Sequence, residues 1–200
     1  MNPNPTLVIV ANGGSNINSV RFALERLGVK ARLSDDPDTI RKATHVILPG
    51  VGAAGPGMAT LRQKELTDCI RNLSQPVLGV CLGMQLLFEH SEEGDTPCLG
   101  ILPGRVVRLP GQNGLSVPHM GWNPIRVTRS DNPLLHGLDG RHFYFVHSYA
   151  AEINDACAAT CEHGIPFCAS AWKDNFFATQ FHPEKSAQAG ARLLENFTKL

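Results

Sequence analysis

The sequence predicts one α/β domain over residues 1–200, in which helices flank a mostly parallel central sheet. Short, wholly apolar runs alternate with helical patterns along the first half of the chain, as is typical of parallel strands buried on both faces. Between about residues 95 and 150 the runs become shorter and are interrupted by Gly and Pro, which indicates short antiparallel strands. No internal repeat, low-complexity tract or linker divides the sequence.

The expected elements follow in chain order. The first strand is an apolar run at residues 7–10. The helical pattern after it has Val20, Leu24 and Leu27 on one face, and Gly28 is placed to stop this helix. Further strands are expected at residues 31–33, 46–48, 77–80, 106–109, 143–146 and 176–181, and further helices over residues 83–89 and 187–199.

Charge and hydropathy narrow the classes of function. Eighteen basic residues balance eighteen acidic ones, so no sequence-wide field recruits nucleic acid or an anionic membrane. No apolar run approaches the ~20 residues that cross a bilayer, and the N-terminal residues do not resemble a signal peptide. We therefore expect a cytoplasmic protein with neither nucleic acid nor membrane as a partner. Its six cysteines are expected to be free thiols or core residues.

Cys81 lies in the segment Gly79-Val80-Cys81-Leu82-Gly83, between an apolar strand and a helix. A nucleophile at such a corner sits in a strained turn, and the glycines two residues before and after it leave room for the closely packed backbone. The start of the helix favours thiolate over thiol, and the amide of Leu82 points where an oxyanion would form. Cys81 is therefore the candidate nucleophile, whereas the other five cysteines are expected to be structural.

A second cysteine cluster raises the alternative of a zinc site. It consists of Cys157, Cys161, His163 and Cys168. Its spacing matches no common structural zinc site, and the residues between look like strand and turn. We expect no metal there.

His182 and Glu184 form an H-P-E segment just past a late apolar strand. Residues two apart in an extended backbone project to the same side, and Pro183 restricts its neighbour to extended geometry. Glu184 can therefore hold one imidazole nitrogen and leave the other facing Cys81. The alternative is a loop histidine with a solvated glutamate. His119 and His147 compete for the role, but neither is followed by a carboxylate two residues on.

Five motifs occur in an order that resembles a known family. They are LPGVG (48–52), PVLGVCLGMQLLFEHSEEG (76–94), VPHMGWN (117–123), FYFVHSY (143–149) and QFHPEKS (180–186). With them the chain resembles the class I, or triad-type, glutamine amidotransferases, which have a flavodoxin-like fold. The SEEG, PHMGWN and FVHSY segments resemble one branch in particular, the glutaminase subunits of imidazole glycerol phosphate synthase from histidine biosynthesis.

The resemblance implies a role for each matching residue. Cys81 would be the nucleophile, His182 the acid and base, and Glu184 its orienter. Val51 and Leu82 would supply the oxyanion hole. Positions implied to contact the substrate glutamine are Gly50, Gly52, Gln85, Glu93, Ser148 and Tyr149. No cofactor is implied.

The resemblance also implies a partner, a (βα)8-barrel cyclase subunit that receives the ammonia in a heterodimer. The candidate residues for the face that meets it are His119, Met120, Trp122 and Asn123, although an aromatic and Met cluster is more often core. One departure is visible. The family's first loop usually reads D-Y-G-x-G-N, whereas this chain has Ala-Asn-Gly-Gly-Ser-Asn at residues 11–16.

Two other functions stay open at this point. The chain could be the glutaminase of another synthase, such as that of pyridoxal phosphate, although SEEG and PHMGWN argue against it. It could also be a non-catalytic regulatory subunit of the same fold. That alternative normally goes with a lost nucleophile or base, and here all three triad positions are filled.

Overall fold

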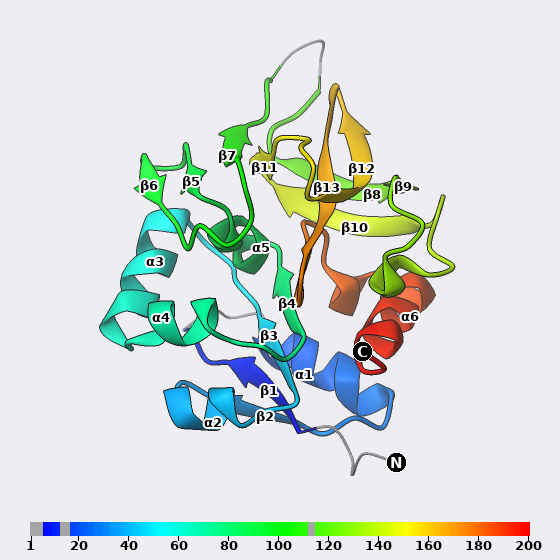
Figure 1. Ribbon diagram of the computed structural model, residues 1–200. Coiled ribbons are helices and arrows are strands. Elements are labelled where there is room, and N and C mark those ends of the chain that lie inside the picture. Colours follow the sequence, from blue (N-terminus) through cyan, green and yellow to red (C-terminus); the bar gives the residue numbers. More distant parts are fainter. Residues whose placement is uncertain (1–5, 13–16, 112–114) are drawn as a thin grey trace.

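The computed structural model describes residues 6–12, 17–111 and 115–200, and its centre is a parallel sheet (Figure 1). Neighbouring strands pair in the order β2-β1-β3-β4-β14, and all four of these pairings are parallel. This is the flavodoxin-like strand order. The strands are β1 (Leu7–Val10), β2 (Ala31–Ser34), β3 (His45–Leu48), β4 (Val77–Val80) and β14 (Phe176–Thr179).

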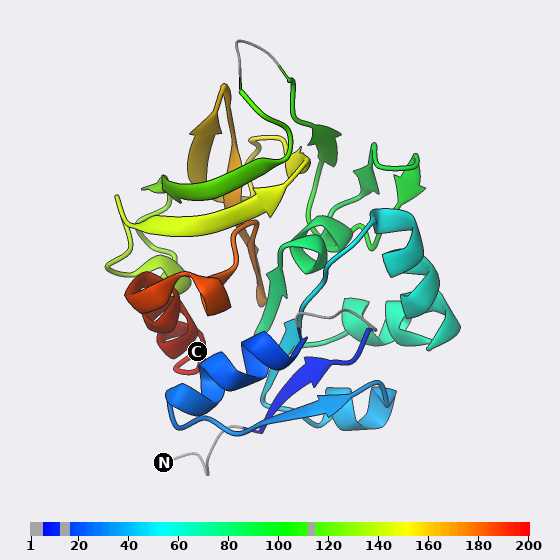
Figure 2. The same ribbon diagram turned by 180° about the vertical axis from the view of Figure 1, so that it is seen from behind.

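Helices cover both faces of this sheet because successive strand residues point to opposite sides. In β1, Val8 and Val10 pack into the core on one face, whereas Leu7 and Ile9 pack into the core on the other. The first face carries α2 (Pro37–Arg41), α3 (Ala54–Gln63), α4 (Leu66–Arg71) and α5 (Leu82–Leu87) (Figure 1). The second face carries α1 (Ile17–Arg26) and α6 (Ala187–Phe197) (Figure 2). No helix within the described ranges is long and apolar enough to cross a membrane.

From residue 90 onwards the chain extends the sheet with mostly antiparallel strands. These are β5 (His90–Ser91), β6 (Thr96–Pro97), β7 (Arg105–Arg108), β9 (Arg126–Val127), β11 (Tyr149–Ala151), β12 (Cys157–His163) and β13 (Ile165–Lys173). A separate antiparallel pair is formed by β8 (His119–Pro124) and β10 (His142–His147). Two 3-10 turns, η1 (Pro133–Leu135) and η2 (Pro183–Lys185), complete the described elements.

The predicted fold class is confirmed, and the predicted strands are present with small shifts at their ends. The last predicted strand ends at Thr179 rather than at residue 181. The helix predicted over residues 83–89 ends at Leu87, because the backbone of Phe88 is extended (φ −71°, ψ 178°). The carbonyl oxygens of the last helical turn accept hydrogen bonds from residues 99–102, which follow β6. Leu99 donates to Leu86, and Ile101 and Leu102 both donate to Leu87.

Three helices were not anticipated, namely α2, α3 and α4. The start of α3 contains Gly55, Pro56 and Gly57, which resemble a turn in the sequence. Proline is tolerated in the first turn of a helix, where its missing N–H would have no intrahelical partner. Gly57 also lets α3 approach Leu82 and Leu86 of α5, since an added Cβ would come within 3.1–3.3 Å of their side chains.

Candidate active site

Cys81 occupies a sharp corner between β4 and α5. Its backbone has φ +53° and ψ −112°, a region that side-chain-bearing residues rarely adopt. The corner is still tied to the sheet, because the Cys81 N–H donates to the carbonyl oxygen of Thr179 at 2.8 Å. A non-glycine residue held in such a conformation is strained, and strain of this kind is concentrated at functional sites.

The glycines on either side of Cys81 are required by close packing. A Cβ added to Gly83 would lie 1.8 Å from the carbonyl oxygen of Leu48, and one added to Gly79 would lie 2.9 Å from that of Gly83. Both distances are shorter than real Cβ contacts. The structure thus gives a physical reason for the small residues of the G-x-C-x-G segment.

His182 and Glu184 lie together immediately after β14. The Nδ1 atom of His182 is 2.7 Å from Oε1 of Glu184, and both side chains are almost completely buried. Burial lowers the pKa of His182, but hydrogen bonds to Cys81 and Glu184 outweigh it and raise the pKa to about 10. The three residues therefore form a continuous series, with the imidazole between the thiol and the carboxylate.

A pair of buried glutamines also reaches the sulfur of Cys81. Gln85 donates from Nε2 to the carbonyl oxygen of Tyr149 at 2.9 Å and to Oε1 of Gln180 at 3.0 Å. Gln180 in turn donates from Nε2 to Sγ of Cys81 at 3.8 Å. Gln180 was not singled out from the sequence, although it begins the QFHPEKS motif.

A cavity of about 330 Å³ opens beside Cys81. Nine of the residues singled out from the sequence line it: Val51, Gly52, Cys81, Leu82, Gln85, Glu93, Ser148, Tyr149 and His182. Pro118, Val146, His147 and Lys185 complete the lining. The strand ends that carry these residues come from distant parts of the chain, so the fold gathers the predicted positions into one site.

Two of the predicted positions lie outside the lining of this cavity. Glu184 lies behind His182, as expected of an orienting group. Gly50 packs against the start of α5, where an added Cβ would lie 2.8 Å from the backbone nitrogen of Gly83. Glu93 lines the cavity and also accepts from the Ala54 N–H at 2.8 Å, which fixes one carboxylate oxygen at the start of α3.

Two buried histidines form a hydrogen-bonded pair near the site. The Nδ1–H of His147 donates to the Tyr149 carbonyl oxygen at 2.8 Å, because a carbonyl oxygen can only accept. Its Nε2 therefore accepts from Nδ1 of His119 at 3.0 Å. The Nε2 of His119 accepts from the Asn123 amide at 2.8 Å. Burial lowers the pKa of His119 to about 4 and that of His147 to about 3.

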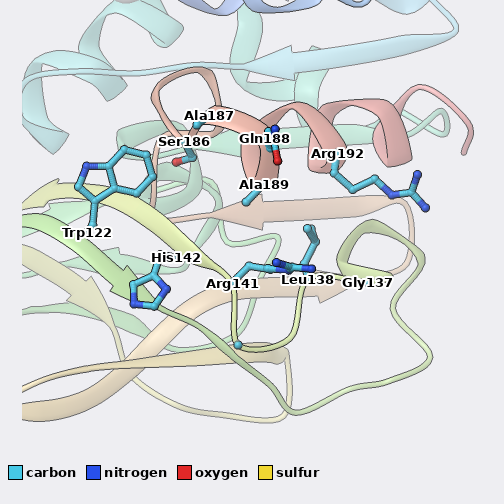
Figure 3. A pocket seen from close by; sticks show the side chains of 11 residues that line it. Trp122, Gly137, Leu138, Arg141, His142, Ser186, Ala187, Gln188, Ala189 and Arg192 are labelled. Carbon is cyan, nitrogen blue, oxygen red and sulfur yellow. The ribbon is translucent and has the colours of Figure 1, made fainter.

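A second, larger cavity of about 580 Å³ lies away from the triad, between α6 and the β8–β10 pair. Trp122 and His142 border it on one side, and residues from Ser186 to Arg192 border it on the other (Figure 3). None of its lining residues is a thiol or a carboxylate. The smaller cavity is the better candidate for an active site because Cys81 and His182, the predicted nucleophile and base, both line it.

All six cysteines are free thiols. Within the described ranges no three His, Cys, Asp or Glu side chains are grouped so as to hold a metal ion. In the Cys157 to Cys168 cluster, the thiols of Cys157 and Cys168 donate to the carbonyl oxygens of Ala159 and Ser170.

Comparisons with known proteins agree with this geometry. The family model described as glutamine amidotransferase class-I matches residues 8–200. The chain therefore belongs to the class-I glutamine amidotransferases. Within that family it is 48% identical over 194 residues to the imidazole glycerol phosphate synthase subunit HisH of Xylella fastidiosa, with 97% of each chain covered. It is 50% identical over 195 residues to the subunit of the same name from Xanthomonas campestris, again with 97% of each covered.

Solved structures show the same fold at lower sequence identity. A putative GMP synthase subunit from Thermoplasma acidophilum superposes with a TM-score of 0.76 and 21% identity, covering 100% of this chain and 94% of that one. The PurLQS structure from Thermotoga maritima gives a TM-score of 0.73 at 16% identity, covering 98% and 99%.

Proposed function

We propose that this class-I glutamine amidotransferase is the glutaminase subunit of imidazole glycerol phosphate synthase, with Cys81, His182 and Glu184 as its catalytic triad. The proposal is supported by the sequence identity of 48–50% to curated HisH subunits, over 97% of each chain. The observation that carries it is the buried Cys81–His182–Glu184 series beside a cavity of about 330 Å³.

The geometry supports hydrolysis in two steps. The Cys81 thiol passes its proton to His182 as the sulfur attacks the side-chain carbonyl carbon of glutamine, and His182 then gives this proton to the departing ammonia, which leaves a thioester. Water then attacks the thioester, His182 accepts its proton, and the protonated imidazole returns a proton to the sulfur as glutamate leaves. Glu184 holds the imidazole in orientation throughout.

The other predicted site residues each have a role in the proposal. The backbone amides of Val51 and Leu82 stabilise the oxyanion. Gln85, Glu93, Ser148 and Tyr149 surround the amino-acid end of glutamine, with Glu93 placed for its ammonium group. Gly52 gives the substrate amide room to approach. Gly50 contributes through packing, since it lies against α5.

The proposed partner is a (βα)8-barrel cyclase that uses the ammonia to make imidazole glycerol phosphate and an aminoimidazole carboxamide ribotide. On β8, Met120 is 62% exposed and Trp122 is 50% exposed, which supports this strand as the docking face. His119 was also predicted for that face, but it is only 2% exposed and lies beneath it. We further propose that residues 1–200 form one amidotransferase domain and that the protein is cytosolic, which its six free thiols support.

The experiment is a glutaminase assay on the chain mixed with a (βα)8 cyclase and the nucleotide substrate of that cyclase. We expect glutamate formation that is abolished in Cys81→Ser and in His182→Asn, each checked for folding by circular dichroism. The matched control is His136→Asn, which changes an exposed histidine in the same way and should leave glutamate formation unchanged. Retention of full activity by Cys81→Ser would refute the triad.

A further inference from the structure

Gln180 is a buried polar residue that the triad mechanism does not use. It follows β14 and is completely buried. Its side chain lies between two functional groups, with Oε1 accepting from Gln85 at 3.0 Å and Nε2 lying 3.8 Å from Sγ of Cys81. A buried amide costs free energy unless its hydrogen bonds are satisfied, so its placement beside the sulfur calls for a reason.

The orientation of the Gln180 amide is fixed by its neighbours. The carbonyl oxygen of Tyr149 can only accept, so the end of Gln85 that faces it must be the Nε2 donor. That same nitrogen faces Gln180, which must therefore present its oxygen. The other end of Gln180, facing Cys81, is then the NH2 group. The alternative amide flip would set two NH2 groups against each other.

We propose that Gln180 is a positioning residue, which donates a hydrogen bond to the Cys81 sulfur and holds it in the reactive orientation. The inference rests on Cys81 being the nucleophile. A donor on the sulfur stabilises its anionic form more than its protonated form. It also restrains the side chain of a residue whose backbone, at φ +53°, is already unusual. Gln85 thus serves the sulfur indirectly, through Gln180, as well as lining the substrate cavity.

The test uses Gln180→Met, which has similar size and shape but no donor. The control is Gln75→Met, which removes a glutamine whose Nε2 donates to the Ile40 carbonyl oxygen outside the active site. The first readout is the rate of Cys81 alkylation by iodoacetamide against pH, followed by peptide mapping. Charged or titratable groups near the sulfur are unchanged in both variants: Glu93, His147, His182, Glu184 and Lys185.

In Gln180→Met, alkylation of Cys81 at neutral pH is expected to slow by about tenfold, as for loss of one hydrogen bond to a charged group. With the cyclase present, kcat should fall about tenfold while KM for glutamine stays within about twofold, since the sulfur and not the substrate has lost a contact. Gln75→Met should leave both measurements unchanged.

A folded Gln180→Met protein with the wild-type alkylation profile and wild-type kcat would overturn the proposal. So would a variant that changed KM alone, because Gln180 would then act on the substrate. Failure of the triad itself would look different, since Cys81→Ser would then retain activity whatever the result at Gln180.

Discussion

The side-chain amide of Asn12 donates a hydrogen bond to the carbonyl oxygen of Pro49 at 2.6 Å. The bond joins the first loop to the LPGVG segment, whose Val51 and Gly52 line the cavity. Lys64 holds the same loop by donating to the carbonyl oxygen of Ala11 at 2.7 Å. The loop that departs from the family pattern is therefore still attached to the proposed oxyanion segment, although residues 13–16 lie outside the described ranges.

The first prediction concerns this attachment. In Asn12→Ala, activation of glutamine hydrolysis by the cyclase should fall about fivefold, because the hydrogen bond that couples Asn12 to the Pro49 carbonyl oxygen is lost. The hydrolysis rate of the isolated chain should not change. The measurement is the ratio of the two rates. Asn175→Ala is the control, since this amide also donates to backbone carbonyls, those of Leu73 and Gln75. An unchanged ratio in Asn12→Ala would show that the loop acts by another route.

The second prediction is that the oxyanion hole is completed by the partner. Gly50 is closely packed against α5, whereas Gly52 has φ +99° and a Cβ added to it would meet no atom within 4 Å. The Val51 N–H belongs to the peptide between Gly50 and Val51, and a glycine on each side of Val51 lowers the barrier to rotating the peptides that flank it. One oxyanion donor is worth roughly 3–4 kcal/mol, so hydrolysis should rise about a hundredfold or more from the isolated chain to the complex with bound nucleotide.

The test is to measure the rate of glutamine hydrolysis in three samples: the isolated chain, the chain with the cyclase, and the chain with the cyclase and its nucleotide. Three equal rates would mean that the hole is already formed in the free protein, and that the glycines serve packing alone.

The third prediction is that Cys81 is the thiol most reactive towards a glutamine-like electrophile. Burial raises the pKa of Cys98 and of Cys161 to about 11, which keeps both protonated at neutral pH. Cys157 is the critical competitor, because a hydrogen bond with Cys168 lowers its pKa. Peptide mapping after labelling distinguishes them, and label found mainly on Cys157 would contradict the assignment of Cys81.

The fourth prediction concerns Glu184. In Glu184→Gln the pKa of His182 should fall, because the carboxylate is one of the two groups that raise it against burial. Turnover should drop roughly 10³–10⁴-fold, less than in Cys81→Ser or His182→Asn. NMR titration of His182 and the three rates test this. If Glu184→Gln were as inactive as Cys81→Ser, Glu184 would need a more direct role than orientation.

The fifth prediction is a pH dependence of stability that comes from His119 and His147. Their pKa values are lowered on folding from 6.5 to about 4 and about 3, so the unfolded chain binds more protons below pH 6.5. Their contribution to stability is therefore complete above pH 6.5 and is lost as the pH falls. Between pH 6.5 and 5 the free energy of unfolding should decrease by about 2–3 kcal/mol from this pair.

Chemical denaturation at several pH values measures this slope. His119→Asn combined with His147→Gln should flatten it, whereas the exposed His136→Asn should not. An equally steep slope in the double variant would assign the pH dependence to other groups.

The grouping of the three proposed triad residues could be predicted from the sequence because each of its parts is local. The G-x-C-x-G corner and the H-P-E segment both carry their geometry within a few residues. The role of Gln180 could not be predicted this way, since its orientation depends on Gln85 and on the carbonyl of Tyr149, which come from other elements. The pairing of His119 with His147 likewise depends on the register of β8 against β10, where the two stand directly opposite each other.

The pairing of β4 with β14 also has a consequence for how the protein folds. These strands come from opposite halves of the chain, and their register places Cys81 beside the strand that leads to His182. Bringing the two strands together loses the conformational entropy of the long intervening chain before any stabilising contact forms, so this pairing is slow. A chain in which only β1 to β4 have assembled holds the proposed nucleophile but not the proposed base. Recovery of activity during refolding would therefore report on the joining of the two halves, rather than on the first collapse of the sheet.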